Sequence, residues 1–349
     1  MGLKILFKDS TTHSQRQLEK KVWIYPAHLS MYATYLRNKG NDVIWFGKDD
    51  GSFDKVIESD LDIPINFEEL PIPDRKFTNS MNPKYLSYGN YKYSKGSHYL
   101  SSNLCWWAGA KGCVFCLDSK RILDGEHRGV RSTDHVMSEI EDCVSIGHNE
   151  LFDDAGTIPI NDWLEDLCHK MIKSKLNKKI VLGCNLKPIK QNFYLMKQAG
   201  FRFILVGVES ANQSTIDKIQ KGQHSEKVIE NIKSMSDAGL EPHITTMTTY
   251  PWETEQEEEN NIRQFQYLLR KGYAKTGQVS IYSPPRTAPD PNSIGHKRLP
   301  KYYEVYKSPE FWFNKIKDIR EWADVAYLLR GGRLVAEEYW RKRVHRKTA

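Results

Sequence analysis

The sequence has few cysteines and no long hydrophobic run, and each absence excludes a class of protein. Six cysteines among 349 residues are too few for a disulfide-built scaffold. No apolar run reaches the roughly 18–20 residues that cross a bilayer, and the stretch 5–7 near the start is too short for the core of a signal peptide. We therefore expect a cytoplasmic protein with no membrane span.

Positive charge is in modest excess, and much of the excess lies near the C-terminus. Lysine and arginine total 51 against 44 aspartate and glutamate, a net charge of +7, and much of the surplus lies in 341–347. Such a tail can bind nucleic acid or another anion, but no interleaved aromatic residues accompany it. We interpret it as a solvated chain end, expect no nucleic acid partner, and take the charge as a slight preference for an anionic substrate.

The first 95 residues predict a small α/β region followed by a connector. A strand at Lys4–Lys8, a helix at Tyr25–Lys39 and a strand at Asp42–Gly47 form a βαβ start of the doubly wound type. The pattern then stops, because 51–95 is rich in polar residues and proline, with room for one short strand. We expect 1–95 to be a truncated Rossmann-like region with a long connector.

From about Tyr99 onwards, strand-like and helix-like segments alternate. The predicted strands are Glu150–Asp153, Ile180–Gly183, Phe203–Val208, His243–Thr249 and Gln278–Tyr282. The predicted helices between them are Asp134–Ile146, Ile160–Ser174, Ile189–Ala199, Ser225–Ala238 and Glu255–Leu269. Repeated βα units predict a parallel sheet covered by helices. Five or six units make a partial (β/α)6 barrel over 96–295, followed by a helical, basic segment at 296–349 that packs across it.

Three of the six cysteines, Cys105, Cys113 and Cys116, lie within twelve residues, in a loop before the first barrel helix. Thiolates are soft ligands that select iron–sulfur clusters, zinc or copper(I). Structural zinc takes four protein ligands, and His127 or His135 could supply a fourth, so a zinc-stabilised nucleic-acid-binding protein stays open as an alternative. A 4Fe–4S cluster held by three cysteines leaves one iron open to a ligand, which is a catalytic arrangement.

A three-cysteine loop ahead of a βα barrel resembles the radical S-adenosylmethionine (radical SAM) superfamily. The family spacing is Cys-x3-Cys-x2-Cys, whereas this chain has seven residues in the first gap. Five further segments are similar to family motifs, in the family order, and resemble most the subgroup that carries a cobalamin domain: Glu150–Asp154, Gly183–Asn185, Phe203–Ser210, Ile216–Gly222 and Thr248–Thr254. From the residues alone, the Asp153–Asp154 and Glu209–Ser210 pairs could also be helix caps.

The resemblance implies a cofactor set and a chemistry. Cys105, Cys113 and Cys116 would bind the 4Fe–4S cluster, whose open iron would chelate S-adenosylmethionine. A flavodoxin-like or ferredoxin-like electron donor would drive cleavage to a 5′-deoxyadenosyl radical, which would abstract hydrogen from a substrate that the sequence does not identify. Contacts to S-adenosylmethionine would come from eight residues: Phe115 near the adenine, Asp153, Asp154, Asn185, Gly207, Glu209, Ser210 and Tyr250.

The same subgroup resemblance raises cobalamin as a further cofactor. A full domain of that type takes roughly 100–130 residues, more than precede the cysteine loop. No Asp-x-His-x-x-Gly segment is present to put a histidine on cobalt. We expect a remnant that does not bind cobalamin, with a cobalamin-dependent radical SAM methyltransferase as the alternative.

Overall fold

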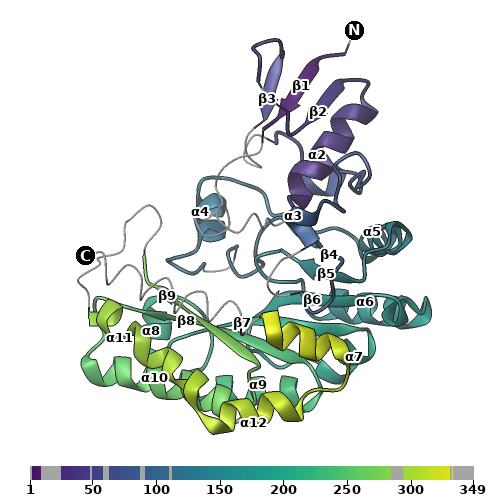
Figure 1. The fold of residues 1–349 in the computed structure, drawn as a ribbon. Coiled ribbons are helices and arrows are strands. Elements are labelled where there is room, and N and C mark those ends of the chain that lie inside the picture. Colours follow the sequence, from purple (N-terminus) through teal and green to yellow (C-terminus); the bar gives the residue numbers. More distant parts are fainter. Residues whose placement is uncertain are drawn as a thin grey trace, which may run out of the picture.

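The computed structural model of this chain describes residues 2–8, 25–47, 49–57, 63–86, 91–109, 112–283, 294–330 and 332. These residues build two parallel sheets, a small one of order β2-β1-β3 and a large one of order β4-β5-β6-β7-β8-β9. The small sheet and its helix stand at one end of the molecule, and the large sheet forms its body (Figure 1).

The predicted βαβ start is present in the N-terminal region. It consists of β1 (Lys4–Phe7), α2 (Ala27–Asn38) and β2 (Asp42–Trp45), with the short connector strand realised as β3 (Lys55–Ile57). Both strand pairs are parallel. Side chains from β1 and α2, with Ile57, form a separate apolar core, because one face of a three-stranded sheet needs a helix to cover it.

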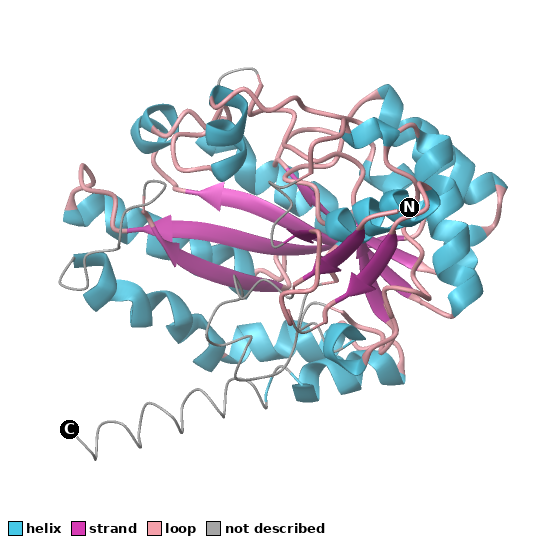
Figure 2. Ribbon diagram, turned by 90° about the horizontal axis from the view of Figure 1, so that it is seen from above, coloured by secondary structure: helices cyan, strands magenta, loops and turns pink. Residues whose placement is uncertain are grey.

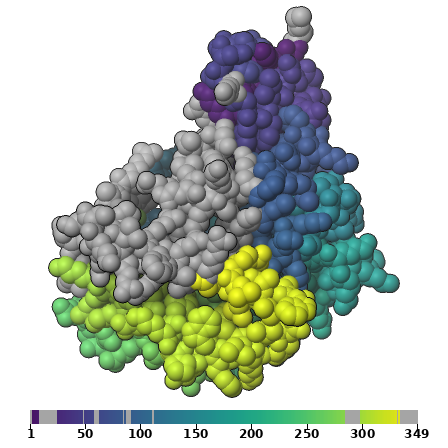
Figure 3. All heavy atoms as spheres, in the orientation of Figure 1, coloured from purple at the N-terminus to yellow at the C-terminus, as the bar shows by residue number. Residues whose placement is uncertain are grey.

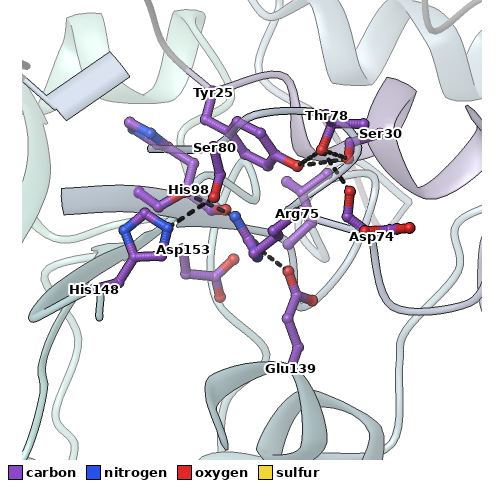
Figure 4. A network of polar contacts seen from close by, with 12 residues as sticks. Tyr25, Ser30, Asp74, Arg75, Thr78, Ser80, His98, Glu139, His148 and Asp153 are labelled. Atoms are coloured by element: carbon purple, nitrogen blue, oxygen red, sulfur yellow. Dashed lines mark hydrogen bonds and ion pairs between the residues drawn. The ribbon is translucent and has the colours of Figure 1, made fainter. Parts of the chain in front are cut away.

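The connector is more ordered than its composition predicts. It contains a turn of 3-10 helix at Phe67–Glu69 and the short helix α3 (Pro83–Leu86). Between them lies Arg75, whose side chain is fully buried. This guanidinium pairs with Glu139 and donates to the carbonyl of His98 and the hydroxyl of Ser97. The connector is therefore part of the junction between the two sheets (Figure 4).

The large sheet confirms the predicted partial barrel. Its strands are β4 (Gly96–Tyr99), β5 (Glu150–Asp153), β6 (Val181–Leu186), β7 (Phe201–Glu209), β8 (Glu241–Thr248) and β9 (Thr276–Ile281). Every neighbouring pair is parallel. Strand β4 is absent from the predicted set, because Gly-Ser-His-Tyr has no aliphatic residue to signal burial. Its four residues are nevertheless buried.

Helices lie around the sheet, as Figure 2 shows from above. The predicted helices are α5 (Thr133–Ile146), α6 (Asp162–Lys173), α7 (Phe193–Gln198), α9 (Ser225–Asp237) and α10 (Glu255–Arg270). Two short helices were not predicted, α4 (Leu117–Leu123) and α8 (Gln213–Lys218), since two turns show little periodicity. The long helices have clear sequence signals: Thr254 and Glu257 form a capping box at the start of α10.

The last part of the C-terminal segment lies where the barrel strands begin, whereas its first helix lies beside the start of α10, where Arg298 pairs with Glu255. The segment contains α11 (Ile294–Tyr302), a 3-10 turn at Tyr303–Lys307, α12 (Pro309–Lys317) and a further helix at 322–330, and it forms part of the lower face in Figure 3. Lys92, just before β4, pairs with Glu321 and Asp324 at 2.8 and 2.6 Å. The segment thus packs on the barrel as expected, while the basic tail at 341–347 lies outside the described residues. No helix in the described ranges is long and apolar enough to span a membrane.

Candidate active site

The predicted site residues gather at one edge of the large sheet. Asp153 ends β5, Asn185 lies near the end of β6, Glu209 ends β7 and Tyr250 follows β8. The carboxyl ends of parallel strands share one edge, where βα barrels place their active sites. The cysteine loop follows β4 at this same edge, and the amide of Val114 donates to the carbonyl of Ile219 at 3.2 Å.

The three loop cysteines are free thiols that differ in exposure. Cys113 is buried, whereas Cys105 and Cys116 are half-buried. Burial raises the pKa of Cys113 to about 11, although the Lys221 ammonium opposes this shift. Burial also raises the pKa of Cys116. The free thiols of Cys113 and Cys116 are therefore protonated near neutral pH, and binding to metal must release these protons.

The arrangement of these thiols bears on which metal group they could hold. In the described ranges, no three or more His, Cys, Asp or Glu side chains are arranged to hold a metal ion. Thus neither His127 nor His135 joins the cysteines in a site of that kind. A structural zinc site needs four ligands that converge on one ion. In a 4Fe–4S cluster each thiolate binds its own iron, so the sulfurs surround the cluster. The loop supplies three free thiols for such a cluster, although among the described residues they do not converge on one point either.

Asp118, which sequence reasoning missed, anchors the start of the cysteine loop. Its carboxylate accepts from the amide of Cys105 at 2.8 Å. A Cβ at Gly156 would lie 2.1 Å from that carboxylate oxygen and 3.0 Å from the Cβ of Cys105. Glycine is therefore required where the loop after β5 passes the cysteine loop. No sequence motif marks Asp118, since its role depends on contacts across two loops.

The aspartate pair at the end of β5 divides into a buried and an exposed residue. Asp153 is buried and accepts from the amides of Ser101 and Ala155 at 2.9 and 3.2 Å. Burial raises its pKa to about 6. Asp154 is exposed, yet desolvation by the surrounding protein and the charges of Asp153 and Asp118 raise its pKa to about 7.

Neither the Asp153–Asp154 pair nor the Glu209–Ser210 pair caps a helix. Helix α6 begins at the N-cap Asn161, not at an aspartate of the pair. Helix α8 begins at the N-cap Asn212, two residues beyond Ser210. Asp153 instead holds the loop after β4, while Asp154 is accessible to a ligand.

Asn185 and Ser210 both hold loops in place. The side-chain amide of Asn185 donates to the carbonyl of Ala155 at 2.7 Å. The Ser210 hydroxyl is fully buried and donates to Glu253 at 2.8 Å. Glu253 also accepts from Thr215 at 2.7 Å, so the network joins the segments after β7 and β8.

Glu209 has an unusual backbone and a specific partner. Its φ is +64°, a value that costs free energy for any residue with a Cβ, and the pairing with β8 shifts register between Gly207 and Glu209. Its carboxylate pairs with Lys221 at 2.6 Å. A Cβ at Gly207 would lie 2.3 Å from the Glu209 carboxylate and 2.6 Å from the Lys221 ammonium. Gly207 therefore makes room for this ion pair.

An aromatic cluster completes the edge beyond Glu209. Tyr250 lies 5.5 Å from Trp252 and 4.9 Å from Tyr282, measured between ring centroids. Phe115, between the last two cysteines, packs against the same cluster. The Tyr250 hydroxyl is buried and has no hydrogen-bond partner among the described residues. The edge thus has carboxylates near Cys105 and an ion pair with aromatic rings near Cys113.

Comparisons with known proteins find similarity over part of the chain. Residues 102–265 match the profile described as Radical SAM superfamily. A GTP 3′,8-cyclase of Clostridium botulinum is 20% identical over 130 residues, which cover 37% of this chain and 41% of that protein. One from Peptoclostridium acidaminophilum is 21% identical and is covered to 40%. The chain thus spans about two fifths of the curated relatives it matches.

The solved structures that align with this chain have low sequence identity and TM-scores below 0.5. The cobalamin-dependent S-adenosylmethionine radical enzyme OxsB, with aqua-cobalamin bound, is 15% identical, with 88% of this chain and 43% of that chain covered and a TM-score of 0.47. The radical S-adenosylmethionine methyltransferase TsrM from Kitasatospora setae, with tryptophan and aza-SAM bound, is 17% identical, with 56% and 38% covered and a TM-score of 0.47. Residues 102–265, which include the cysteine loop and most of the parallel six-stranded sheet, are thus similar to the radical SAM superfamily.

Proposed function

We propose that this chain is a radical SAM enzyme whose Cys105, Cys113 and Cys116 hold a 4Fe–4S cluster. When bound and reduced, that cluster supplies the electron that cleaves S-adenosylmethionine to a 5′-deoxyadenosyl radical, which then abstracts hydrogen from the substrate. The observation that carries the proposal is the position of three free thiols at the carboxyl edge of a parallel barrel. Asp154 and the Glu209–Lys221 pair lie at the same edge.

The surrounding residues have separable roles in this proposal. The exposed Asp154 carboxylate suits the ammonium group or a ribose hydroxyl of S-adenosylmethionine. Phe115 and Tyr250 offer aromatic surface for the adenine ring, and Gly207 lets Glu209 and Lys221 meet beside it. Asp153, Asn185 and Ser210 position the loops, because their polar groups already bond within the protein.

The domain division and the partners are also proposals. We divide the chain into 1–95, the barrel at 96–295 and the segment 296–349. A flavodoxin-like or ferredoxin-like donor would supply the electron, and the net charge of +7 favours an anionic substrate over a cationic one. We expect no cobalamin binding, because the described part of the N-terminal sheet has three strands. A cobalamin-dependent methyltransferase would instead retain added hydroxocobalamin through gel filtration.

The test is anaerobic reconstitution of the native chain and a Cys113→Ala/Cys116→Ala variant, followed by iron and sulfide analysis. S-adenosylmethionine and dithionite are then added and 5′-deoxyadenosine is measured. We expect about four irons per native chain, loss of most of them in the double variant, and nucleoside from the native chain only. Cys168→Ala is the control, because this buried cysteine lies in α6. A colourless native protein with one zinc and no nucleoside would contradict the proposal.

A further inference from the structure

The long gap between Cys105 and Cys113 contains a tryptophan that is docked on the barrel. The indole N–H of Trp107 donates to the carbonyl of Gln220 at 2.9 Å. Its ring lies directly against Gly222, where a Cβ would be only 1.9 Å from the ring atom Cζ2. Gly222 also has a φ of +61°, so both space and backbone require glycine there. The widened loop is therefore anchored at a fixed place.

Trp107 and its neighbour Trp106 face the ammonium group of Lys187, which directly follows β6. The Lys187 Nζ lies 3.6 Å from the centroid of the Trp107 ring and 5.4 Å from that of Trp106. It also donates to the backbone carbonyl of Lys221 at 2.5 Å. The residue is only 4% exposed. Aromatic faces and one carbonyl thus hold a cation in a nearly dry position.

Lys187 lacks a carboxylate partner, whereas the nearby Lys221 has one. Lys221 forms an ion pair with Glu209, whereas no Asp or Glu in the described ranges lies within 4.0 Å of the Lys187 ammonium. Burial and the charge of Lys221 lower the pKa of Lys187 to about 8, whereas ionised Cys113 and Cys105 would oppose that shift. A buried cation needs a compensating charge, and the cysteine loop supplies one only when its sulfurs are ionised, as metal binding requires.

We infer that Lys187, held by Trp106 and Trp107, is a positioning residue that stabilises the reduced state of the 4Fe–4S cluster. The inference rests on the function proposed above. One electron from the reduced donor enters the cluster and adds one negative charge, without forming or breaking a bond. A nearby buried cation attracts the reduced state more strongly than the oxidised state. The extra residues of the Cys-x7-Cys gap serve to bring the two indole rings over Lys187.

The experiment is an anaerobic redox titration of the reconstituted chain, followed by the EPR signal of the reduced cluster. We expect Lys187→Gln to lower the ratio of reduced to oxidised cluster about tenfold at a fixed potential, which is 59 mV for one electron. Lys187→Arg keeps the charge and should retain the native potential. Lys190→Gln is the matched control, because it removes the same charge from an exposed position three residues away.

A second variant keeps the test decisive if Lys187→Gln loads too little cluster. Trp107→Ala leaves the charge in place but removes its aromatic support, so the potential should shift in the same direction by less. If Lys187→Gln binds a full cluster, an unchanged potential in that variant would overturn the inference. If it does not, an unchanged potential in a loaded Trp107→Ala variant would overturn it. A native chain that binds no iron would instead refute the proposed function.

Discussion

Buried charge is handled in opposite ways at the junction of the two sheets and at the carboxyl edge of the barrel. At the junction, Glu139 pairs with Arg75, as Figure 4 shows, and also with Arg131. All three side chains are fully buried. At the edge, Lys187 has no carboxylate partner among the described residues, and Asp154 is exposed. Paired charges hold a structure together, as Glu209 and Lys221 also do at the edge, whereas charges without an oppositely charged partner are available to a ligand.

The largest test of this contrast is Glu139→Ala at the junction. The change leaves two buried guanidinium groups without their carboxylate, so the free energy of unfolding should fall by about 3–5 kcal/mol. Urea denaturation followed by circular dichroism measures it. Glu141→Ala on the exposed face of the same helix is the control. A loss below about 1 kcal/mol would mean that Glu139 does not compensate these charges.

A second test uses the pH dependence of stability at the junction. Burial lowers the pKa of His148 to about 4, so the unfolded state takes up a proton near pH 6.5 and the folded state does not. The free energy of unfolding should therefore fall between pH 6.5 and pH 4, by at most about 1.4 kcal/mol per unit from this group. His148→Gln should flatten that slope, and the exposed His169→Gln should leave it unchanged. An equal slope in both variants would assign the effect to other groups.

A third test addresses the exposed carboxylate at the barrel edge. Because the pKa of Asp154 is raised to about 7, more of the anion is present at pH 8 than at pH 6. Binding of cationic S-adenosylmethionine should therefore strengthen with rising pH, and Asp154→Asn should weaken it about tenfold at pH 8. Isothermal titration calorimetry measures both effects, with Asp162→Asn as the surface control. Affinity that stays pH-dependent in Asp154→Asn would place the titrating group elsewhere.

The smallest expected effect is that of Tyr250→Phe. The Tyr250 hydroxyl has no hydrogen-bond partner in the described ranges, so its loss should change the free energy of unfolding by less than about 0.5 kcal/mol. The ring contacts persist, and the affinity for S-adenosylmethionine should stay the same. A large loss of affinity without loss of stability would show that this hydroxyl binds the ligand.

Sequence patterns predict this fold in the segments where regularly spaced apolar residues are also the buried residues. The strand runs from β5 to β7 contain aliphatic and aromatic residues, those of β8 and β9 contain β-branched residues, and their helices are amphipathic, so the parallel barrel follows. Sequence patterns do not predict strand β4 or the order of the connector, because their burial depends on polar pairing. Arg75, for example, pairs with a carboxylate 64 residues away. No local pattern encodes such a distance.

The candidate site also contains residues that the sequence predicts and residues that it does not. The cysteine spacing and the residues at strand ends predict that Cys113, Asp153 and Glu209 share one edge, because parallel strands align their carboxyl ends. Lys187 and Asp118 carry no motif, since their importance comes from neighbours on other loops. The split between a buried Asp153 and an exposed Asp154 likewise needs three-dimensional contacts.

The contacts of Lys92 with Glu321 and Asp324 have a consequence for how the barrel can open. Strands β4 and β9 are the two edges of the large sheet, and these ion pairs join the segment before β4 to the segment after β9. The Arg330 side chain adds bonds to the carbonyls of Tyr91 and Lys92 at 2.9 and 2.8 Å. The two edges are thus fastened together where the strands begin. Any widening that admits a large substrate must occur at the opposite end, beside the cysteine loop.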